Sequence, residues 1–243
     1  MKKRHAGLNH IYRLIWNEAL NTWIAVSENT KGRGRRLSGR KLLATWLALF
    51  PAALLAAPTG GNITSGNGAI TQTNTQTTIN QQTNKLSIDW NTFSVGTNES
   101  VRFNQPSSSA IALNRVTSQS PSQILGQLSA NGQVFILNPN GVLFGQGAQV
   151  NVGGLVASTL SLSNADFASG NFSFTKNDRA GNVINQGTLT ANNGGYIALI
   201  APEVRNQGII SARLGTALLG AGDKVNIPRQ SRGLYKVNAS KAS

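Results

Sequence analysis

Side chains that could carry out catalysis are few in this chain. Both histidines, His5 and His10, stand close to the N-terminus. General acid–base catalysis by paired carboxylates needs two acids on one face, and only Glu203 and Asp223 have a spacing that could bring them together. A hydrolase or polysaccharide lyase is therefore a minor alternative that rests on those two residues. The acids beyond residue 57 are Asp89, Glu99, Asp166, Asp178, Glu203 and Asp223.

Other catalytic and ligand-binding patterns are also missing from the sequence. The chain has no cysteine, which removes disulfides and thiolate metal sites. Gly145-Gln146-Gly147 resembles the start of a phosphate-binding loop, but neither a third glycine nor a Lys-Ser/Thr pair follows at the required place. We therefore expect no enzyme activity, no cofactor, no metal and no small-molecule substrate.

A tight turn is the most distinctive local feature of the sequence. Asn138-Pro139-Asn140-Gly141 lies between two apolar runs, residues 134–137 and residues 142–144. Pro139 has no backbone N–H and Gly141 can adopt a positive φ, so the four residues predict a turn that joins two strands. If the turn is recognised by a partner, the carboxamides of Asn138 and Asn140 are the first candidates for the contact.

Positive charge is concentrated at the two ends of the chain. The net charge of +14 would by itself suggest nucleic acid or an anionic membrane as a partner. Residues 1–57 carry +8 and residues 224–243 carry +5, which leaves only +1 for residues 58–223. A nucleic-acid-binding protein needs a basic face on its folded part, so we expect no nucleic-acid partner.

Residues 1–57 have the layout of an export signal. A basic segment, residues 31–41, precedes an uncharged apolar segment, residues 42–57, which ends in small residues. Cleavage is expected after Ala56 or Ala57. The alternative, a membrane-spanning helix, is disfavoured because the apolar run is short for a span of about 20 residues and contains a proline.

The first 30 residues extend this signal unusually far upstream. Leu8, Ile11, Leu14, Ile15 and Ala19 recur at helical spacing, which predicts an amphipathic helix. This helix is either a small folded N-terminal element or a part of the signal. Helical segments are expected only in this signal region of an otherwise all-β chain.

The rest of the chain contains a repeat with a period of 21 residues. Residues 183–191 align with residues 204–212, and residues 132–139 align with residues 195–202 at three periods. The copy between them is weak, so an insertion or an irregular coil is expected at about residues 163–180. Such a period, with short apolar strands and Asn/Gly turns, predicts a solenoid.

The best-fitting fold is a single-stranded right-handed parallel β-helix, a pectin-lyase-like solenoid, over residues 58–223. Stacking at about 4.8 Å would give about eight coils and a rod of roughly 40 Å. The Thr- and Gln-rich N-terminal segment, with some antiparallel strands, is the expected cap. No cap is evident at the C-terminal end, where residues 224–243 form a basic tail.

Two details of the coil follow from the alignment. Asn185 and Asn206 are equivalent and could stack as a hydrogen-bonded ladder. Gly187 and Gly208 are expected at coil corners, where the backbone turns sharply.

Several segments resemble a known family of exported proteins. Ile11-Tyr12-Arg13-Leu14-Ile15-Trp16-Asn17, Ala25-Val26-Ser27-Glu28 and Lys31-Gly32-Arg33-Gly34-Arg35-Arg36 resemble the extended signal peptide region of very large exported proteins of Gram-negative bacteria. Residues 104–116, 124–126 and 131–145 resemble the N-terminal secretion domain of filamentous haemagglutinin-type exoproteins, the passengers of two-partner secretion.

The resemblance implies a function, partners and site residues. It implies a secretion-directing domain that is exported by the inner-membrane Sec machinery and recognised by an outer-membrane barrel transporter with POTRA domains. The turn at residues 138–141 is the implied secretion motif, and Asn104, Pro106, Asn114 and Arg115 belong to a second family motif. The product is then secreted across both membranes and is extracellular or associated with the cell surface.

Members of that family are usually far longer than this chain. The resemblance therefore implies a fragment, a truncated gene product or an exoprotein whose remainder is missing, and that remainder would hold the adhesive, cytolytic or toxin activity. The alternative is a free-standing small β-helix adhesin that binds glycan or a host-cell surface through its own face.

Overall fold

The computed structural model describes residues 12–17, 22–27, 57–227 and 238–240. The chain divides into two compact units, residues 1–48 and residues 49–243. The expected basic segment, and the apolar segment up to Ala56, lie outside the described residues. Within the described part of the chain, no helix is long and apolar enough to cross a membrane.

The described part of the first unit is a two-stranded antiparallel hairpin of β1 (Tyr12–Asn17) and β2 (Thr22–Ser27). The amphipathic helix expected through this segment is therefore wrong over residues 12–17. Both strands are rich in aromatic and β-branched residues, which favour extended backbone. The antiparallel register places Trp16 opposite Trp23.

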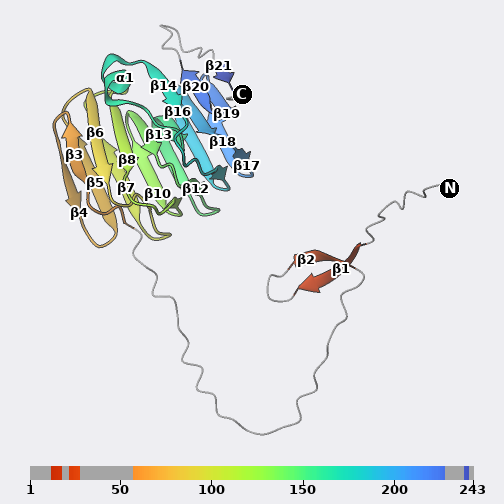
Figure 1. Cartoon of the computed structure of the whole chain (residues 1–243). Coiled ribbons are helices and arrows are strands. Elements are labelled where there is room, and N and C mark those ends of the chain that lie inside the picture. The colour runs from red at the N-terminus through yellow and green to blue at the C-terminus, as the bar shows by residue number, and fades with distance from the viewer. Residues whose placement is uncertain (1–11, 18–21, 28–56, 228–237, 241–243) are drawn as a thin grey trace. The chain divides into compact units, whose positions relative to one another are not determined.

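Residues 57–227 form a parallel β-solenoid of about seven turns, rather than the expected eight (Figure 1). Successive coils follow one another in chain order along its length. They are β3 (Asn62–Ser65), β4 (Gly68–Gln72), β5 (Gln76–Gln81), β6 (Lys85–Trp90), β7 (Ser100–Asn104), β8 (Ile111–Val116), β9 (Ser122–Ile124), β10 (Gln127–Ala130), β11 (Gln133–Leu137), β12 (Val142–Phe144), β13 (Gln149–Ser158), β14 (Phe172–Thr175), β15 (Val183–Asn185), β16 (Thr188–Ala201), β17 (Val204–Asn206), β18 (Ile209–Ala212), β19 (Thr216–Ala221) and β20 (Lys224–Ile227).

Three stacks of parallel strands form the walls of the solenoid. The first wall contains β6, β8, β11, the second halves of β13 and β16, and β19. The second wall contains β5, β7, β10, the first halves of β13 and β16, and β18. The third wall contains β9, β12, β15 and β17. Each coil therefore stacks on the coil before it, wall by wall.

The N-terminal end of the solenoid is closed by antiparallel strands. β3 pairs with β6 and β4 pairs with β5, both in antiparallel register. These pairings cover the edges of the first coil, which would otherwise be open to pairing with another chain. The expectation of an N-terminal cap with antiparallel strands is confirmed.

Two hydrophobic cores hold the coils together. The first fills the interior of the solenoid and includes the fully buried Trp90, Phe93 and Phe144. The second lies on the outer side of the first wall, where Phe135 packs edge-on against Phe172 at a ring-centroid distance of 5.1 Å. The first wall is therefore apolar on both faces, like the strands of parallel sheets that are covered on both sides.

The outer core exists because residues 163–180 leave the stack as an excursion. β13 stacks directly on β16, while the chain between them forms α1 (Asn164–Ser169) and then β14, which pairs antiparallel with β20. The expected insertion is therefore confirmed, whereas the expectation of helices only in the signal region is wrong. The offset between residues 133 and 196 spans two stacking steps, through residue 154, and not three even periods.

The register of the last coil differs slightly from the aligned repeat. β15 and β17 are 21 residues apart, as expected, and Asn185 Nδ2 donates to Asn206 Oδ1 at 2.7 Å, which confirms the ladder. In the first wall, however, Ile197 pairs with Ala217 and not with Leu218. The corner between β18 and β19 is one residue shorter than the corresponding corner within β16. An alignment with a constant offset of 21 residues therefore misplaces β19 by one residue.

The last described coil leaves the interior core uncovered. Among the described strands, β17, β18 and β19 each pair with a parallel neighbour on one side only. Leu219 lies in the same column as the fully buried Leu199, yet it is 52% exposed. The residues that follow form β20, and β21 (Asn238–Ser240) pairs antiparallel with β20, so strand structure continues into the expected basic tail.

Candidate functional site: the asparagine turn

The turn at residues 138–141 forms a corner of the solenoid and not a hairpin. It connects β11 of the first wall to β12 of the third wall. The backbone N–H of Gly141 donates to the Asn138 carbonyl at 3.1 Å, and Gly141 has φ of 124°. That conformation is costly for any residue with a side chain, which explains the glycine.

Asn138 is fully buried, and its carboxamide uses its whole hydrogen-bonding capacity. Its Nδ2 donates to the Ser120 carbonyl and to Ser122 Oγ, both at 3.0 Å. Its Oδ1 accepts from the Asn140 backbone N–H at 2.9 Å and from Asn140 Nδ2 at 3.1 Å. Two donors and two acceptor positions are all that an asparagine amide offers, so the folded turn does not display this group to a partner.

Asn140 and Pro139 tie the turn to the coils on either side. Asn140 Nδ2 also donates to the Ser118 carbonyl at 2.9 Å, in the preceding coil. The Pro139 carbonyl accepts from the backbone N–H of Gly181 at 2.7 Å, at the end of the excursion. The turn is therefore the middle layer of a three-layer corner.

The four residues of the second family motif do not form one site. Asn104 and Pro106 are exposed, and Asn104 Nδ2 donates to Asn80 Oδ1 at 2.8 Å. Asn114 is fully buried inside the solenoid, where its Oδ1 accepts from Trp90 Nε1 at 3.0 Å. Arg115 points to the outer face of the first wall, so the buried and the exposed members of the motif belong to different parts of the coil.

Arg115 helps to fasten the excursion to the first wall. Its guanidinium donates to Ser87 Oγ at 2.8 Å and to the Leu162 carbonyl at 3.1 Å. Burial lowers the pKa of the Arg115 guanidinium, and the charge of the neighbouring Asp89 acts in the opposite direction. The role that its contacts support is attachment of the segment that leads into α1.

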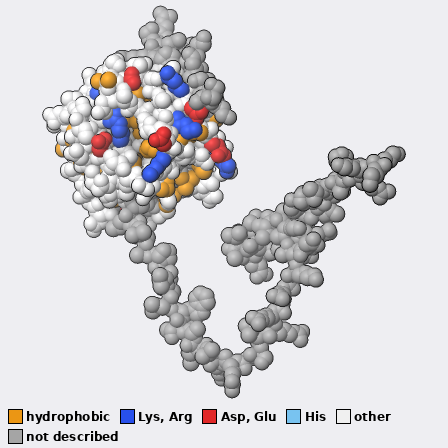
Figure 2. All heavy atoms as spheres, viewed as in Figure 1, with side chains coloured by type: hydrophobic (Ala, Val, Ile, Leu, Met, Phe, Trp, Pro, Cys, Tyr) orange, Lys and Arg blue, Asp and Glu red, His pale blue; other side chains and the backbone are white. Residues whose placement is uncertain are grey.

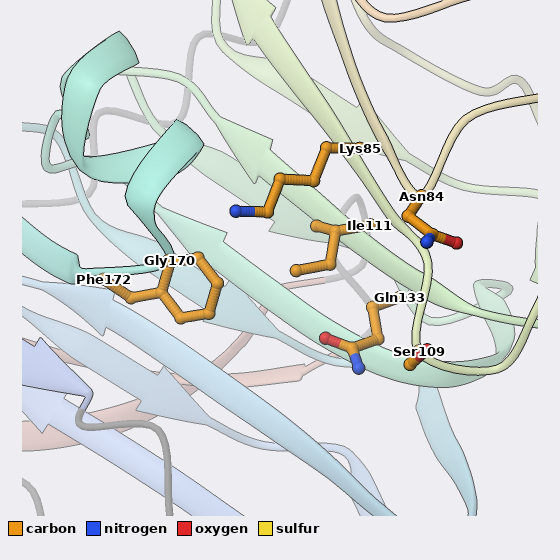
Figure 3. A pocket seen from close by; sticks show the side chains of 7 residues that line it. All are labelled: Asn84, Lys85, Ser109, Ile111, Gln133, Gly170 and Phe172. Carbon is orange, nitrogen blue, oxygen red and sulfur yellow. The ribbon is translucent and has the colours of Figure 1, made fainter.

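A cleft opens beside the excursion, at the edge of the outer core. It has a volume of about 280 Å³, and Figure 3 shows Lys85, Ile111, Gln133 and Phe172 around it. Lys85 Nζ extends toward α1 and donates to the carbonyls of Phe167 and Ala168 at 2.9 and 2.6 Å. This lysine therefore joins β6 to the end of the helix.

Two buried polar residues that hydrogen-bond at the corners of the coil could not be identified from the sequence. One is Ser122, the partner of Asn138. The other is Gln105, whose Nε2 donates to Gln81 Oε1 at 3.0 Å and whose Oε1 accepts from the Gly132 backbone N–H at 2.9 Å. Gln105 lay inside the segment that carried the resemblance, but nothing local marked it as the buried residue between exposed neighbours.

The possible carboxylate pair is not formed. Glu203 makes an ion pair with Arg205 at 2.5 Å, and Asp223 makes one with Lys176 at 3.1 Å. Within the described residues no group of three metal-ligating side chains is present. Figure 2 shows acidic and basic side chains interspersed on the visible face, without a continuous basic patch.

The capped parallel solenoid, with the candidate motif at one of its corners, places this protein in the class of β-helical domains. Residues 55–242 match the TPS secretion domain family, and residues 9–57 match the extended signal peptide of the type V secretion system. The chain therefore belongs to the TPS secretion domain family. It is the secretion-directing domain of a secreted or cell-surface exoprotein of the two-partner type, and this family is not one of enzymes.

Individual relatives agree with this assignment. The heme/hemopexin-binding protein of Haemophilus influenzae is 36% identical over 177 residues, which cover 70% of this chain and 20% of that protein. The filamentous hemagglutinin of Bordetella pertussis is 28% identical over 264 residues, covering 86% of this chain and 7% of that protein.

A solved structure is also similar. The crystal structure of the HMW1 secretion domain from Haemophilus influenzae superimposes with a TM-score of 0.71 at 33% identity, covering 77% of this chain and 50% of that one. The chain spans about a fifth or less of the curated relatives described above. The comparisons do not favour the alternative of a free-standing adhesin.

Proposed function

We propose that Asn138, Pro139, Asn140 and Gly141 are the secretion motif that the POTRA domains of the outer-membrane transporter bind. The transporter binds them in the periplasm, after Sec-dependent export and removal of the signal at Ala56 or Ala57. The second family motif, Asn104, Pro106, Asn114 and Arg115, serves mainly the coil that forms afterwards. In this proposal the turn at residues 138–141 is first bound as an unfolded peptide and later forms a corner of the solenoid.

The match to the TPS secretion domain family supports a secretion role for the chain, and the burial of Asn138 sets when its recognition is possible. A fully buried amide with four hydrogen bonds has no free group for a partner. A transporter can therefore read Asn138 only before the corner has formed. A chain in the periplasm that has not yet coiled presents the motif as an accessible peptide.

The beginning of the solenoid is consistent with a mature chain that starts near residue 57. Pro58 is already buried, and its carbonyl accepts from Gln72 Nε2 at 2.6 Å. A cut after Ala56 or Ala57 would leave this first cap contact intact, because it involves only residues on the mature side.

The test compares two buried asparagines in the full chain, co-expressed with its transporter. Asn138→Ala and Asn185→Ala each remove a fully buried amide, so both weaken the coil. Only Asn138→Ala should also reduce the capture of the urea-unfolded mature chain by immobilised POTRA domains. The expected reduction is roughly tenfold, for loss of the hydrogen bonds between the Asn138 carboxamide and the POTRA domain.

Release into the medium should then fall more for Asn138→Ala than for Asn185→Ala. Asn151→Ala changes an exposed asparagine of β13 and serves as the neutral control. Equal capture of the Asn138→Ala and Asn185→Ala chains would remove the proposed recognition of the turn.

A further inference from the structure

Ser122 is a polar residue at an otherwise apolar position of the interior. It begins β9, in the third wall, and stacks in one column with Val142, Val183 and Val204. Val142 and Val183 belong to the interior core, and Ser122 itself is fully buried. A hydroxyl in such a column costs free energy unless it has a partner.

The partner of the Ser122 hydroxyl is the turn in the next coil. Ser122 Oγ accepts from Asn138 Nδ2 at 3.0 Å, and the Ser122 backbone N–H donates to the Gly141 carbonyl at 3.0 Å. Ser122 therefore contacts the first and the last residue of the turn. Without the hydroxyl, one Asn138 amide hydrogen would lose its acceptor in a site that water does not reach.

We infer that Ser122 is the positioning residue of the secretion motif: it captures the Asn138 amide when the coil closes and thereby converts the linear motif into the buried corner. Ser122 acts only when the coil folds, after the transporter has bound the motif. This order of events rests on the proposed recognition of the uncoiled motif. Because Ser122 lies 16 residues before Asn138, its replacement leaves the motif peptide itself unchanged.

The experiment uses the mature chain collected from the medium and a pair of variants at one site. Ser122→Ala removes the hydroxyl, whereas Ser122→Thr retains it in a column of valines that accommodates a β-branched side chain. Ser122→Ala should raise the unfolding equilibrium constant roughly tenfold, the effect of leaving one buried amide hydrogen unpaired. Ser122→Thr should stay within about threefold of the parent chain.

A double-mutant cycle separates this contact from general loss of packing. In the Asn138→Ala background, where the amide is already absent, Ser122→Ala should change the unfolding constant by less than about threefold. If the two effects multiply as independent losses, or if Ser122→Thr is as damaging as Ser122→Ala, Ser122 is not the positioning residue.

Capture of the unfolded chain by POTRA domains provides the second readout. Ser122→Ala should be captured as well as the parent chain, although its folded form is less stable. Reduced capture of Ser122→Ala would overturn the inference that the residue acts only after recognition. If Asn138→Ala is captured normally while the double-mutant coupling is present, the proposed recognition fails and the role of Ser122 in the corner remains.

Discussion

At the scale of single residues, the buried carboxamides are the feature that sets this solenoid apart from a purely apolar one. Asn138 fastens one corner, Asn114 hydrogen-bonds the Trp90 indole inside the coil, and Gln105 fastens another corner. Each makes at least one hydrogen bond to a neighbouring coil. Buried polar networks of this kind favour one arrangement because any other register leaves donors unpaired.

We expect Asn138→Asp to destabilise the folded chain more than Asn138→Ala does. Aspartate has the same shape but carries a charge and cannot donate, so its carboxylate would face the Ser120 carbonyl and Ser122 Oγ in a buried site. An uncompensated buried charge costs about 3–5 kcal/mol, against about 1–3 kcal/mol for an amide deletion. Urea unfolding followed by circular dichroism measures the difference.

The matched control for this substitution is Asn151→Asp, on the exposed outer side of β13. A surface substitution of this kind should change the free energy of unfolding by no more than about 0.5 kcal/mol. Equal effects at positions 138 and 151 would contradict the assignment of Asn138 to a dry, fully paired site.

The sequence allowed the turn and its residues to be predicted, but not what the asparagines do. Pro139 and Gly141 mark a turn by their own backbone preferences, which are local. The partner Ser122 is 16 residues away and meets Asn138 only because coils stack in register. A serine in a polar, Ser-rich segment carries no local sign that it will be buried.

At the scale of structural elements, glycines at one corner permit the coils to stack closely. Gly132 and Gly215 directly precede β11 and β19, and Gly153 and Gly195 lie inside β13 and β16, directly before the halves that belong to the first wall. A Cβ on Gly195 would lie 2.1 Å from the Gly153 carbonyl oxygen, which real structures do not tolerate. The spacing of about 4.8 Å between coils therefore requires glycine at this position.

The neighbouring Gly194 provides a contrast for testing this corner. A Cβ at Gly194 would contact nothing, but its φ of 76° is left-handed, so Gly194→Ala should cost about 1–2 kcal/mol from backbone strain alone. Gly195→Ala should cost more, about 3 kcal/mol or above, because the corner must move apart. Thermal unfolding of the two variants gives the comparison, and a smaller loss for Gly195→Ala would argue against close stacking.

α1 begins with a reciprocal pair of hydrogen bonds that makes it sensitive to pH. The Asp166 backbone N–H donates to Ser163 Oγ at 3.0 Å, and Ser163 Oγ donates to Asp166 Oδ2 at 2.6 Å. This contact, followed by the one from Asn171, lowers the pKa of the Asp166 carboxyl. The ionised Asp166 carboxylate therefore stabilises α1 fully at pH values above the pKa of the unfolded chain, which is about 3.9. This stabilisation is lost as the pH falls through the lower pKa of the folded chain.

An NMR titration of the Asp166 carboxyl should show a midpoint below that of an unstructured aspartate. Ser163→Ala should move the midpoint back up, because the largest cause of the shift is removed. An unchanged midpoint in that variant would mean that the hydroxyl does not act on the carboxylate.

Elements that follow the 21-residue period were predictable, and those that leave it were not. The period arises from stacking, so it could place β15 above β17 and predict the Asn185–Asn206 ladder. The excursion buries its apolar residues against the outside of the first wall, and the positions of these residues do not follow the 21-residue period. The helix predicted for residues 12–17 is wrong because the apolar residues there fit a helical spacing, although their types favour strands.

At the scale of the whole molecule, stability should decline toward the last coil. Leu199 and Leu219 occupy the same interior column, but Leu199 is fully buried and Leu219 is 52% exposed. Leu199→Ala should cost about 2–5 kcal/mol, the usual range for a buried leucine. Leu219→Ala should cost less than about 1.5 kcal/mol, since half of its surface is already in water.

The measurement is the free energy of unfolding of the two variants in urea, with hydrogen exchange along the chain as a second readout. Amides of β19 should exchange faster than those of β11, which pairs on both sides. Equal losses for the two leucines would mean that other residues cover the last coil.

The closed first coil and the uncovered last coil give the molecule a direction of growth. β3 and β4 cover strand edges at one end, whereas at the other end the edges of β18 and β19 are covered by no described strand and Leu219 is half exposed. In a solenoid each coil contacts only its neighbours. We therefore expect coils to add from the capped end, because each added coil then meets strand edges that specify its register.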